Sequence, residues 1–403
     1  GGEKRFFAQR IDYNHLINEQ MKLLVFAYGT QNDFTRFAKF GYDPGGQTER
    51  FYNRDVLAIG ASLNGAHRLG EAPMNWVAGV EYYDEETDWK RWNTSNRVRT
   101  AQTQERMFTI DTLSLYGQAD WEISPALRPM AGLRYDSFSG SYDNRDPGGT
   151  PFSRDMNDYD HISPKLGLRS RVAEGIELRG SVANGFGLPN GEAKYDPTLD
   201  VDAIEYWQYE IGATLTASPD FYVDAAYFIL NSSDEILEDP VGSGNFRNVG
   251  ETRRSGLEAE FRYFTPVEYL ELSLITSLFD SEIESNPNAA LVGKEVVGLP
   301  DNITTLSLDY NPASGWGGRL SWRQVGEYAL TDDNSQSYEG YDLVNASLFY
   351  KARFERGRSL RWYLDLYNLT DEDYAEAVFF GSGTRNYAPA PPTHLTVGVA
   401  LKY

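Results

Sequence analysis

The sequence lacks cysteine and any long hydrophobic run. The absence of cysteine excludes disulfides, cysteine-ligated zinc and thiol nucleophiles. No apolar run approaches the roughly 18 residues that a membrane-spanning helix needs. The chain begins with Gly1 rather than Met and no signal-peptide core follows, so we expect its start to be a processed end or a cut.

Basic residues and histidines are scarce as well. The 403 residues include 37 Lys and Arg against 59 Asp and Glu, which gives a formal net charge of −22. This balance argues against nucleic-acid binding, which requires a basic patch. The histidines are scattered, and the sequence contains no HExxH, no GxSxG and no phosphate loop. We therefore expect no enzyme activity.

Aromatic residues, in contrast, are abundant and alternate with polar ones. The chain has 27 Tyr, 21 Phe and 8 Trp, a composition that suits strands. Near the C-terminus Leu395, Val397, Val399 and Leu401 fall on one face, opposite a face with polar residues. The same period of two occurs at 206–215, 221–229 and 256–263. We predict strands of about ten residues, the length that crosses a bilayer at a tilt.

The connections between the predicted strands alternate between short and long. The short ones contain turn-forming residues and lie at 70–73, 124–125, 174–175, 218–220, 265–266, 311–315 and 355–358. The long ones are polar and lie at 30–55, 84–108, 137–161, 185–204, 231–254, 280–301, 327–341 and 370–393. Short turns on one side and long loops on the other are typical of an outer-membrane barrel. A sheet crosses hydrocarbon only if it closes, because every backbone N–H and C=O must pair internally.

These patterns predict an all-β fold: a transmembrane, antiparallel, up-and-down β-barrel that forms a single domain over 1–403. A soluble all-β assembly is the alternative, since its strands also alternate. We count about 17 strands, as eight hairpins around short turns and a last unpaired strand, whereas bacterial single-chain barrels normally have an even number. We therefore expect an odd number of strands to precede Gly1.

Several motifs resemble those of one family. They are AGLRYD at 131–136, SPKLGL at 163–168, NGFGLPN at 184–190, NVG at 248–250 followed by GLE at 256–258, and NLTD at 368–371 followed by Tyr374. Their order and spacing from about Thr109 to the aromatic terminus Tyr403 resemble those of TonB-dependent outer-membrane receptors. Two positions depart from the pattern, because Gly187 stands where Arg is more usual and Thr370 replaces an aromatic residue. The segment before Thr109 fits by pattern only.

The resemblance implies a bacterial outer-membrane receptor that imports a scarce nutrient, most often a ferric siderophore or another iron chelate. The family barrel has 22 strands and a plugged lumen, so about five strands and the plug would be missing from this chain. Outer-membrane lipid would surround the barrel, and the TonB complex would be contacted only through the missing N-terminal part. A passive, porin-like channel is the alternative function, and an outer-membrane enzyme is a less favoured one.

Candidate ligand-binding residues lie in the long loops, above all in 84–108 and 137–161. Aromatic faces and guanidinium groups there suit a chelate with flat rings and anionic oxygens. The alternative role for the aromatic residues is the interfacial belt that every such barrel needs. The candidates are Trp89, Trp92, Arg97, Arg99, Tyr142, Arg145, Tyr159, Tyr195 and Tyr338.

A second set of charged residues alternates with the lipid-facing positions and is expected to face the lumen. By resemblance these residues would contact the plug or line the path that it vacates. The alternative is a wetted lumen whose charges pair with one another. The set is Arg134, Arg169, Arg179, Glu210, Glu258, Glu260, Arg262, Arg319 and Arg323.

The loop around 143–160 is rich in Asp and Asn, whose oxygens suit calcium. Its spacing does not match the EF-hand pattern, so a solvated acidic loop is the favoured interpretation. We expect no resident cofactor and no other metal site.

Overall fold

The computed structural model describes residues 2–39, 46–124, 126–189, 193–195, 199, 201–238, 246–381 and 383–402. Four residues named or used above, Gly1, Pro125, Asn190 and Tyr403, lie outside this part of the chain, as do parts of the predicted loops 30–55, 185–204, 231–254 and 370–393.

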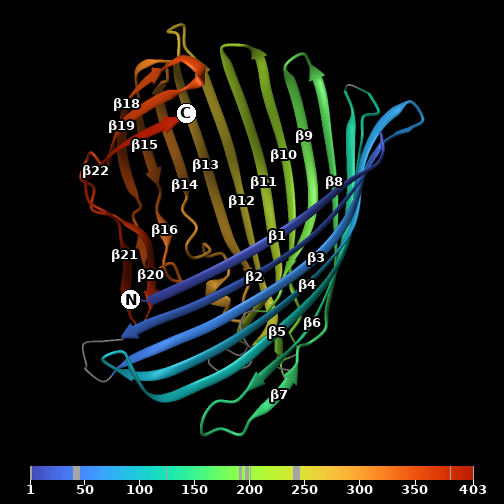
Figure 1. Cartoon of the computed structure of the whole chain (residues 1–403), viewed down its shortest axis with the longest axis vertical. Helices are drawn as coiled ribbons and strands as arrows, with labels where there is room; N and C mark the ends of the chain where they lie inside the picture. The colour runs from blue at the N-terminus through green and yellow to red at the C-terminus, as the bar shows by residue number, and fades with distance from the viewer. Residues whose placement is uncertain are drawn as a thin grey trace. The chain divides into compact units, whose positions relative to one another are not determined.

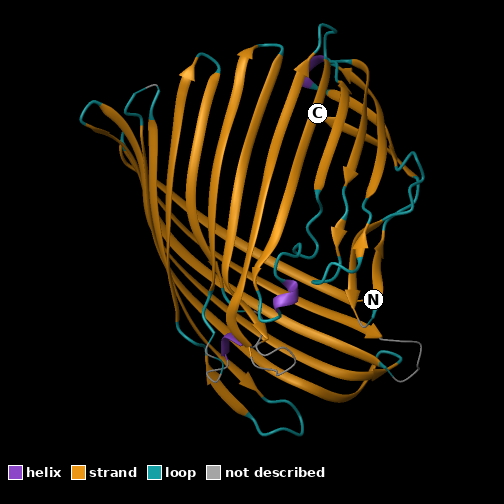
Figure 2. Ribbon diagram, turned by 180° about the vertical axis from the view of Figure 1, so that it is seen from behind, coloured by secondary structure: helices purple, strands orange, loops and turns teal. Residues whose placement is uncertain are grey.

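Antiparallel strands make up most of the described chain (Figures 1 and 2). The main sheet has 18 strands there: β1 (Gly2–Asn18), β2 (Met21–Lys39), β3 (Gln47–Leu69), β4 (Ala72–Ser95), β5 (Val98–Trp121), β6 (Arg128–Asn144), β7 (Phe152–Asp155), β8 (Tyr159–Ala173), β9 (Ile176–Gly187), β10 (Ile204–Ser218), β11 (Phe221–Glu238), β12 (Phe246–Phe264), β13 (Leu270–Ser285), β14 (Asn302–Tyr310), β15 (Gly315–Val325), β18 (Tyr341–Arg353), β19 (Ser359–Tyr367) and β22 (His394–Lys402). Without the four-residue β7 there are 17, the number that the sequence predicts.

The remaining elements are short. Two further sheets have two strands each: β16 (Tyr328–Ala329) with β17 (Ser337–Tyr338), and β20 (Ala375–Gly381) with β21 (Thr384–Pro389). Three 3-10 helices complete the described chain: η1 (Ala193–Tyr195), η2 (Ala289–Leu291) and η3 (Glu355–Gly357). None of the described helices is both long and apolar enough to cross a membrane.

The chain forms two compact units. Unit 1 comprises Gly1–Gly167, Ala183–Glu205 and Ile236–Asn248, and unit 2 comprises Leu168–Val182, Tyr206–Glu235 and Val249–Tyr403. In unit 1 each strand from β1 to β6 pairs with the next, and β6 also pairs with β7 and β8. In unit 2 the pairing runs from β12 through β13, β14, β15, β18 and β19 to β22. The prediction of a single domain over 1–403 stays a prediction.

Tight turns join successive strands. Gly70 and Gly175 have φ angles of 65° and 70°, in the left-handed region that glycine enters without a steric penalty. At the far end of the β4–β5 hairpin, Asn96 and Arg97 have φ angles of 49° and 65°. A positive φ at both central residues defines the type I′ turn, whose twist matches that of the paired strands.

The strands of unit 1 are longer than the predicted ten residues. Strands β3, β4 and β5 have 23, 24 and 24 residues. Most of the predicted loop 84–108 is therefore a paired hairpin, and much of 30–55 belongs to β2 and β3. The prediction of irregular loops was wrong here because backbone pairing needs no apolar face. Strands that continue beyond the apolar region carry polar residues on both faces and look like loops in sequence.

One face of the unit 1 sheet is apolar and exposed. Ile59 lies directly opposite Tyr82, and Tyr82 lies opposite Leu113. The neighbouring Leu57, Val80 and Leu115 share this face, and the six side chains are 41–53% exposed. A soluble domain would bury such a continuous apolar face, whereas a membrane barrel turns it toward lipid.

Unit 2 repeats this arrangement on its last strand. The apolar residues of β22 lie opposite apolar residues of β19, in the pairs Leu395–Leu366, Val397–Leu364, Val399–Trp362 and Leu401–Leu360. The four β22 side chains are 62–68% exposed, so the predicted shared face of this strand is confirmed. On the other face Gly398 lies opposite Tyr363, and a Cβ at residue 398 would overlap the tyrosine ring. This contact favours the observed register.

We predict that Val399→Arg hinders assembly in a bilayer because the guanidinium would have to enter lipid. The expected loss is about 2–4 kcal/mol in the free energy of unfolding, if residue 399 lies near mid-membrane. Unfolding from phospholipid vesicles measures this loss. Thr396→Arg is the matched control, since Thr396 lies on the other face, opposite Asp365. Equal stability of the two variants would contradict the assignment of faces.

Candidate functional site

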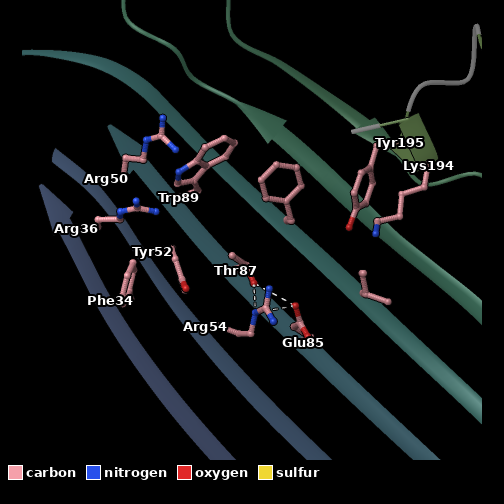
Figure 3. Close-up of a pocket in the computed structure, with 12 residues that line it drawn as sticks. Phe34, Arg36, Arg50, Tyr52, Arg54, Glu85, Thr87, Trp89, Lys194 and Tyr195 are labelled. Carbon is pink, nitrogen blue, oxygen red and sulfur yellow. Dashed lines mark hydrogen bonds and ion pairs between the residues drawn. The ribbon is translucent and has the colours of Figure 1, made fainter. Parts of the chain in front are cut away.

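A cavity of unit 1 lies on the polar face of β2 to β5. Its volume is about 960 Å³. Strands β2 to β5 form one wall, and η1 supplies the other (Figure 3). The residues around it are Phe34, Arg36, Arg50, Tyr52, Arg54, Glu85, Thr87, Trp89, Phe108, Ile110, Lys194 and Tyr195.

Aromatic residues form a row across three strands of this wall. Phe34 lies directly opposite Tyr52, which lies opposite Trp89. The Phe34 and Tyr52 ring centroids are 5.0 Å apart, and those of Trp89 and Phe108 are 6.4 Å apart. Side chains in register on one face of a sheet stand side by side, so this row presents a broad aromatic surface to the cavity.

Cationic residues lie on either side of the aromatic row. Arg36 lies opposite Arg50 on one side, two residues along each strand from Phe34 and Tyr52. On the other side Arg54 Nε lies 3.1 Å from Glu85 Oε1 and donates a hydrogen bond of 3.2 Å to Thr87 Oγ1. The cavity residues include four cations, with Lys194, and one carboxylate, Glu85.

The opposite wall is built from η1. The Tyr195 side chain is 1% exposed and lies against Phe108 and Tyr142, with centroids 5.6 and 5.9 Å apart. Its hydroxyl donates to the Thr109 carbonyl at 3.2 Å. Burial raises the pKa of Tyr195, so the phenol stays neutral at physiological pH. Burial lowers the pKa of Lys194, and the nearby Glu85 partly opposes this shift.

The structure brings only some of the predicted ligand-binding residues to this cavity. Trp89 and Tyr195 line it. Tyr142 and Tyr159 lie behind its wall, 2% and 5% exposed, in a cluster with Met156 and Tyr195. These two rings support the wall and are not open to a ligand in this conformation.

Trp92 and Arg99 belong to a different cavity of about 480 Å³, which they line with Phe51, Lys90, Gln102 and Glu105. Trp92 follows Trp89 by three residues, so the two rings leave β4 on opposite faces. The Arg99 guanidinium lies 3.7 Å from the centroid of the Trp92 ring and forms bonds of 2.7 and 3.0 Å to Glu49.

The other three candidates are not among the residues that line either cavity. Arg97 occupies the β4–β5 turn, with its guanidinium 5.5 Å from the Phe37 ring. Arg145 is largely exposed and pairs with Asp143 at 3.2 Å. Tyr338 belongs to unit 2, where its hydroxyl accepts a hydrogen bond of 3.0 Å from the backbone N–H of Ala375. The ligand-binding role of all nine candidates stays a prediction.

Most of the predicted lumen-facing residues have partners of opposite charge or hydroxyl partners. In unit 1 the Arg134 guanidinium lies 2.8 Å from Asp136 and donates to Ser114 Oγ at 2.7 Å. In unit 2 Arg179 forms two bonds of 2.8 Å to Asp224. Further contacts in unit 2 join Arg179 to Glu210, Arg262 to Glu260, and Arg319 to Asp309 and Ser307.

Three members of the lumen set, Arg169, Glu258 and Arg323, are exposed in unit 2. Arg169 lies on β8, Glu258 on β12 and Arg323 on β15. The observed ion pairs favour the interpretation of mutually paired charges, and a role in contacting a plug stays a prediction.

The acidic loop at 143–160 uses its carboxylates in local contacts. Asp146 pairs with Arg106 at 2.8 Å and accepts a hydrogen bond from the Glu105 N–H at 2.8 Å. Burial alone would raise the pKa of Asp146, but these donors outweigh it and hold the pKa below its usual value. Among the described residues, no group of three or more His, Asp or Glu could hold a metal ion. Calcium binding in this loop stays a prediction.

Of the twelve residues that line the cavity, the sequence predicted only Trp89 and Tyr195 as ligand-binding candidates. The ten others include five side chains of β2 and β3 and one of η1: Phe34, Arg36, Arg50, Tyr52, Arg54 and Lys194. The signal was present, because Phe34 and Arg36, and likewise Arg50, Tyr52 and Arg54, are spaced two apart. Because 30–55 was predicted to be an irregular loop, these residues were not assigned to one face of paired strands.

The long antiparallel strands, the exposed apolar faces and the cavity of unit 1 define a membrane β-barrel with a candidate ligand site. The chain belongs to the TonB-dependent receptor family, since the model described as "TonB dependent receptor-like, beta-barrel" matches residues 2–369. The match includes the segment before Thr109, which fitted by pattern only.

Solved structures share this fold at low sequence identity. The ferric citrate transporter FecA, in its unliganded form, is 16% identical with a TM-score of 0.87, over 100% of this chain and 62% of that one. The siderophore receptor PiuA from Acinetobacter baumannii is 14% identical with a TM-score of 0.83, over 99% and 64%. The ferric-catecholate import receptor Fiu from E. coli K12 is 16% identical with a TM-score of 0.79, over 100% and 64%. The chain thus spans less than two thirds of the length of these structures.

We predict that Arg99→Met loosens the β4–β5 hairpin, because Glu49, whose side chain is only 6% exposed, loses its partner. Leaving a buried polar group unsatisfied costs about 1–3 kcal/mol, and a charged group costs more. Amide hydrogen exchange over 47–53 should therefore become faster. The double variant Glu49→Gln, Arg99→Met removes the unpaired charge and should restore most of the protection. Exchange that is unchanged in the single variant would show that the ion pair contributes no local stability.

Proposed function

We propose that this chain is the barrel of a bacterial outer-membrane receptor that binds a ferric chelate in the unit 1 cavity for import. The observation that carries the proposal is the joint lining of this cavity by aromatic rings and cations. The names of FecA, PiuA and Fiu, which refer to ferric citrate, siderophore and ferric catecholate, support the choice of an iron chelate.

The size and charge of the cavity suit such a ligand. About 960 Å³ lies at the upper end of the range typical of small-molecule sites, roughly 300–1,000 Å³. Aromatic faces stack on flat ligand groups, and guanidinium groups pair with anionic oxygens. The chain carries a net charge of −22, which by itself repels anions. Around the cavity the local charge is positive instead, because four cations there exceed one carboxylate.

Membership of the family supports an outer-membrane location and the TonB complex as a partner. The exposed apolar faces of the strands contact outer-membrane lipid, and the TonB complex supplies energy for import. The protein acts as a receptor and transporter, without an enzymatic step. The alternative, a passive porin-like channel, would need neither a specific ligand nor energy from the inner membrane.

We predict that Trp89→Ala in the intact receptor weakens binding of its ferric chelate by roughly ten-fold, because one face of the aromatic row is lost. Trp92→Ala is the matched variant, since the same residue type leaves the same strand on the opposite face. Titration of the purified receptor with ferric chelates, followed by tryptophan fluorescence, measures both.

A larger loss of affinity in Trp92→Ala than in Trp89→Ala would indicate that the site lies on the other face of β4, and would contradict the proposal. Uptake of labelled iron tests the transport step. Import that continues after the proton motive force is dissipated would favour the passive channel.

A further inference from the structure

The cavity of about 480 Å³ lies on the face of β3 to β5 that also carries the exposed apolar side chains. Trp92 follows Tyr82 by ten residues on β4, and Phe51 precedes Ile59 by eight residues on β3. Even spacings keep side chains on one face of a strand. This cavity therefore continues the apolar face beyond its last apolar residues, and the aromatic row at Trp89 lies on the opposite face.

Two rows of side chains in register build this site. In the first row Phe51 lies directly opposite Lys90, which lies opposite Glu105. In the second row Trp92 lies opposite Gln102. The Gln102 side chain donates a hydrogen bond of 3.0 Å to Glu105 and so connects the two rows. The site thus places two aromatic rings beside an amide, a carboxylate and an ammonium group.

The cations of this site already have carboxylate partners within the protein. Lys90 Nζ lies 2.6 Å from Asp88 Oδ2, and Arg99 Nη2 lies 2.7 Å from Glu49 Oε1. Glu105 adds a third carboxylate. An anionic ligand would be placed beside like charges, which costs free energy. The charges therefore favour a neutral ligand that is rich in hydrogen-bonding groups.

A saccharide has this chemistry. The C–H faces of a sugar ring are apolar and pack against aromatic rings, while its hydroxyls both donate and accept hydrogen bonds. Phe51 and Trp92 supply the rings, and Gln102 supplies a donor and an acceptor. The volume of about 480 Å³ lies within the range of small-molecule sites, roughly 300–1,000 Å³.

The height of the site above the apolar face indicates the source of the saccharide. Tyr82 is the last apolar residue of this face on β4, since Asp84 and Glu86 follow it. The ten residues from Tyr82 to Trp92 span roughly 33 Å along the strand. At a strand tilt of about 40° this is a rise of roughly 25 Å. Phospholipid headgroups extend about 5–8 Å beyond the hydrocarbon, so a lipid must carry a longer headgroup, such as an oligosaccharide, to reach the site.

We infer that the cavity at Phe51 and Trp92 binds the neutral saccharide headgroup of a lipid in the surrounding leaflet. A sugar ring packs against the two aromatic side chains, and its hydroxyls bond to Gln102 and Glu105. The inference goes beyond the proposed function, because it concerns the other face of β4 and a different ligand. It uses only the outer-membrane location.

The test measures binding of three phosphate-free probes to the intact receptor, purified in detergent, by native mass spectrometry. The probes are dephosphorylated lipopolysaccharide with its core oligosaccharide, dephosphorylated lipid A without the core, and the free core oligosaccharide. The variants are Trp92→Ala and Gln102→Ala. Met107→Ala is the control, because Met107 lies opposite Asp88, one row nearer the apolar face, and does not line the cavity. Thermal unfolding establishes that each variant is folded.

The wild-type receptor should bind the lipid with the core more tightly than lipid A. Trp92→Ala should weaken binding of the core-bearing lipid by roughly ten-fold, since the aromatic contact is lost. Gln102→Ala should weaken it by roughly five-fold, since hydrogen bonds to hydroxyls are lost. Met107→Ala should bind as the wild type does, and lipid A binding should be the same in all variants.

Equal affinity of the wild-type receptor for the lipid with and without the core would overturn the inference. Unchanged affinity for the core-bearing lipid in Trp92→Ala would do the same. If the free core oligosaccharide bound as tightly as the lipid that carries it, the site would take a soluble saccharide, and the assignment to a membrane lipid would be wrong.

Discussion

Hydrogen bonding between the backbones of neighbouring antiparallel strands is the constraint on which the rest of this structure depends. In hydrocarbon an unpaired N–H or C=O costs several kcal/mol, so strands that cross a membrane must pair along their length. Pairing fixes the register, and the register fixes which side chains share a face. The exposed apolar face of Ile59, Tyr82 and Leu113 and the polar face with the cavity are two sides of one ladder.

The same ladder builds the candidate site beyond the apolar region. Strands β3, β4 and β5 remain paired far past their apolar residues, and β4 and β5 meet in the tight turn at Asn96–Arg97. A paired hairpin holds side chains at fixed spacings, whereas an irregular loop would have to order them on binding at an entropic cost. The aromatic row and the arginines beside it are therefore held at fixed spacings before any binding event.

Charged side chains are mostly paired elsewhere on the polar faces of the strands, whereas cations are in excess around the cavity. Arg134 with Asp136, and Arg179 with Asp224, satisfy one another on the polar faces of their units. Such pairs keep a polar face hydrated and neutral without attracting a ligand. In the cavity the cations exceed the single carboxylate Glu85, which creates a local attraction for anions in a strongly acidic chain.

The all-β class, the number of long strands, the short turns and the apolar face of the last strand could be predicted from the amino-acid sequence. These features depend on the local periodicity of apolar residues and on turn-forming residues, both of which can be read from neighbouring positions in the sequence. It also led to Trp89 and Tyr195 as candidate ligand residues. The tertiary structure decided which residues meet. Phe34, Tyr52 and Trp89 lie on three different strands, and only cross-strand register places them in one row. Likewise Trp89 and Trp92 are the same residue type on the same strand, but because side chains alternate along β4 they lie on opposite faces.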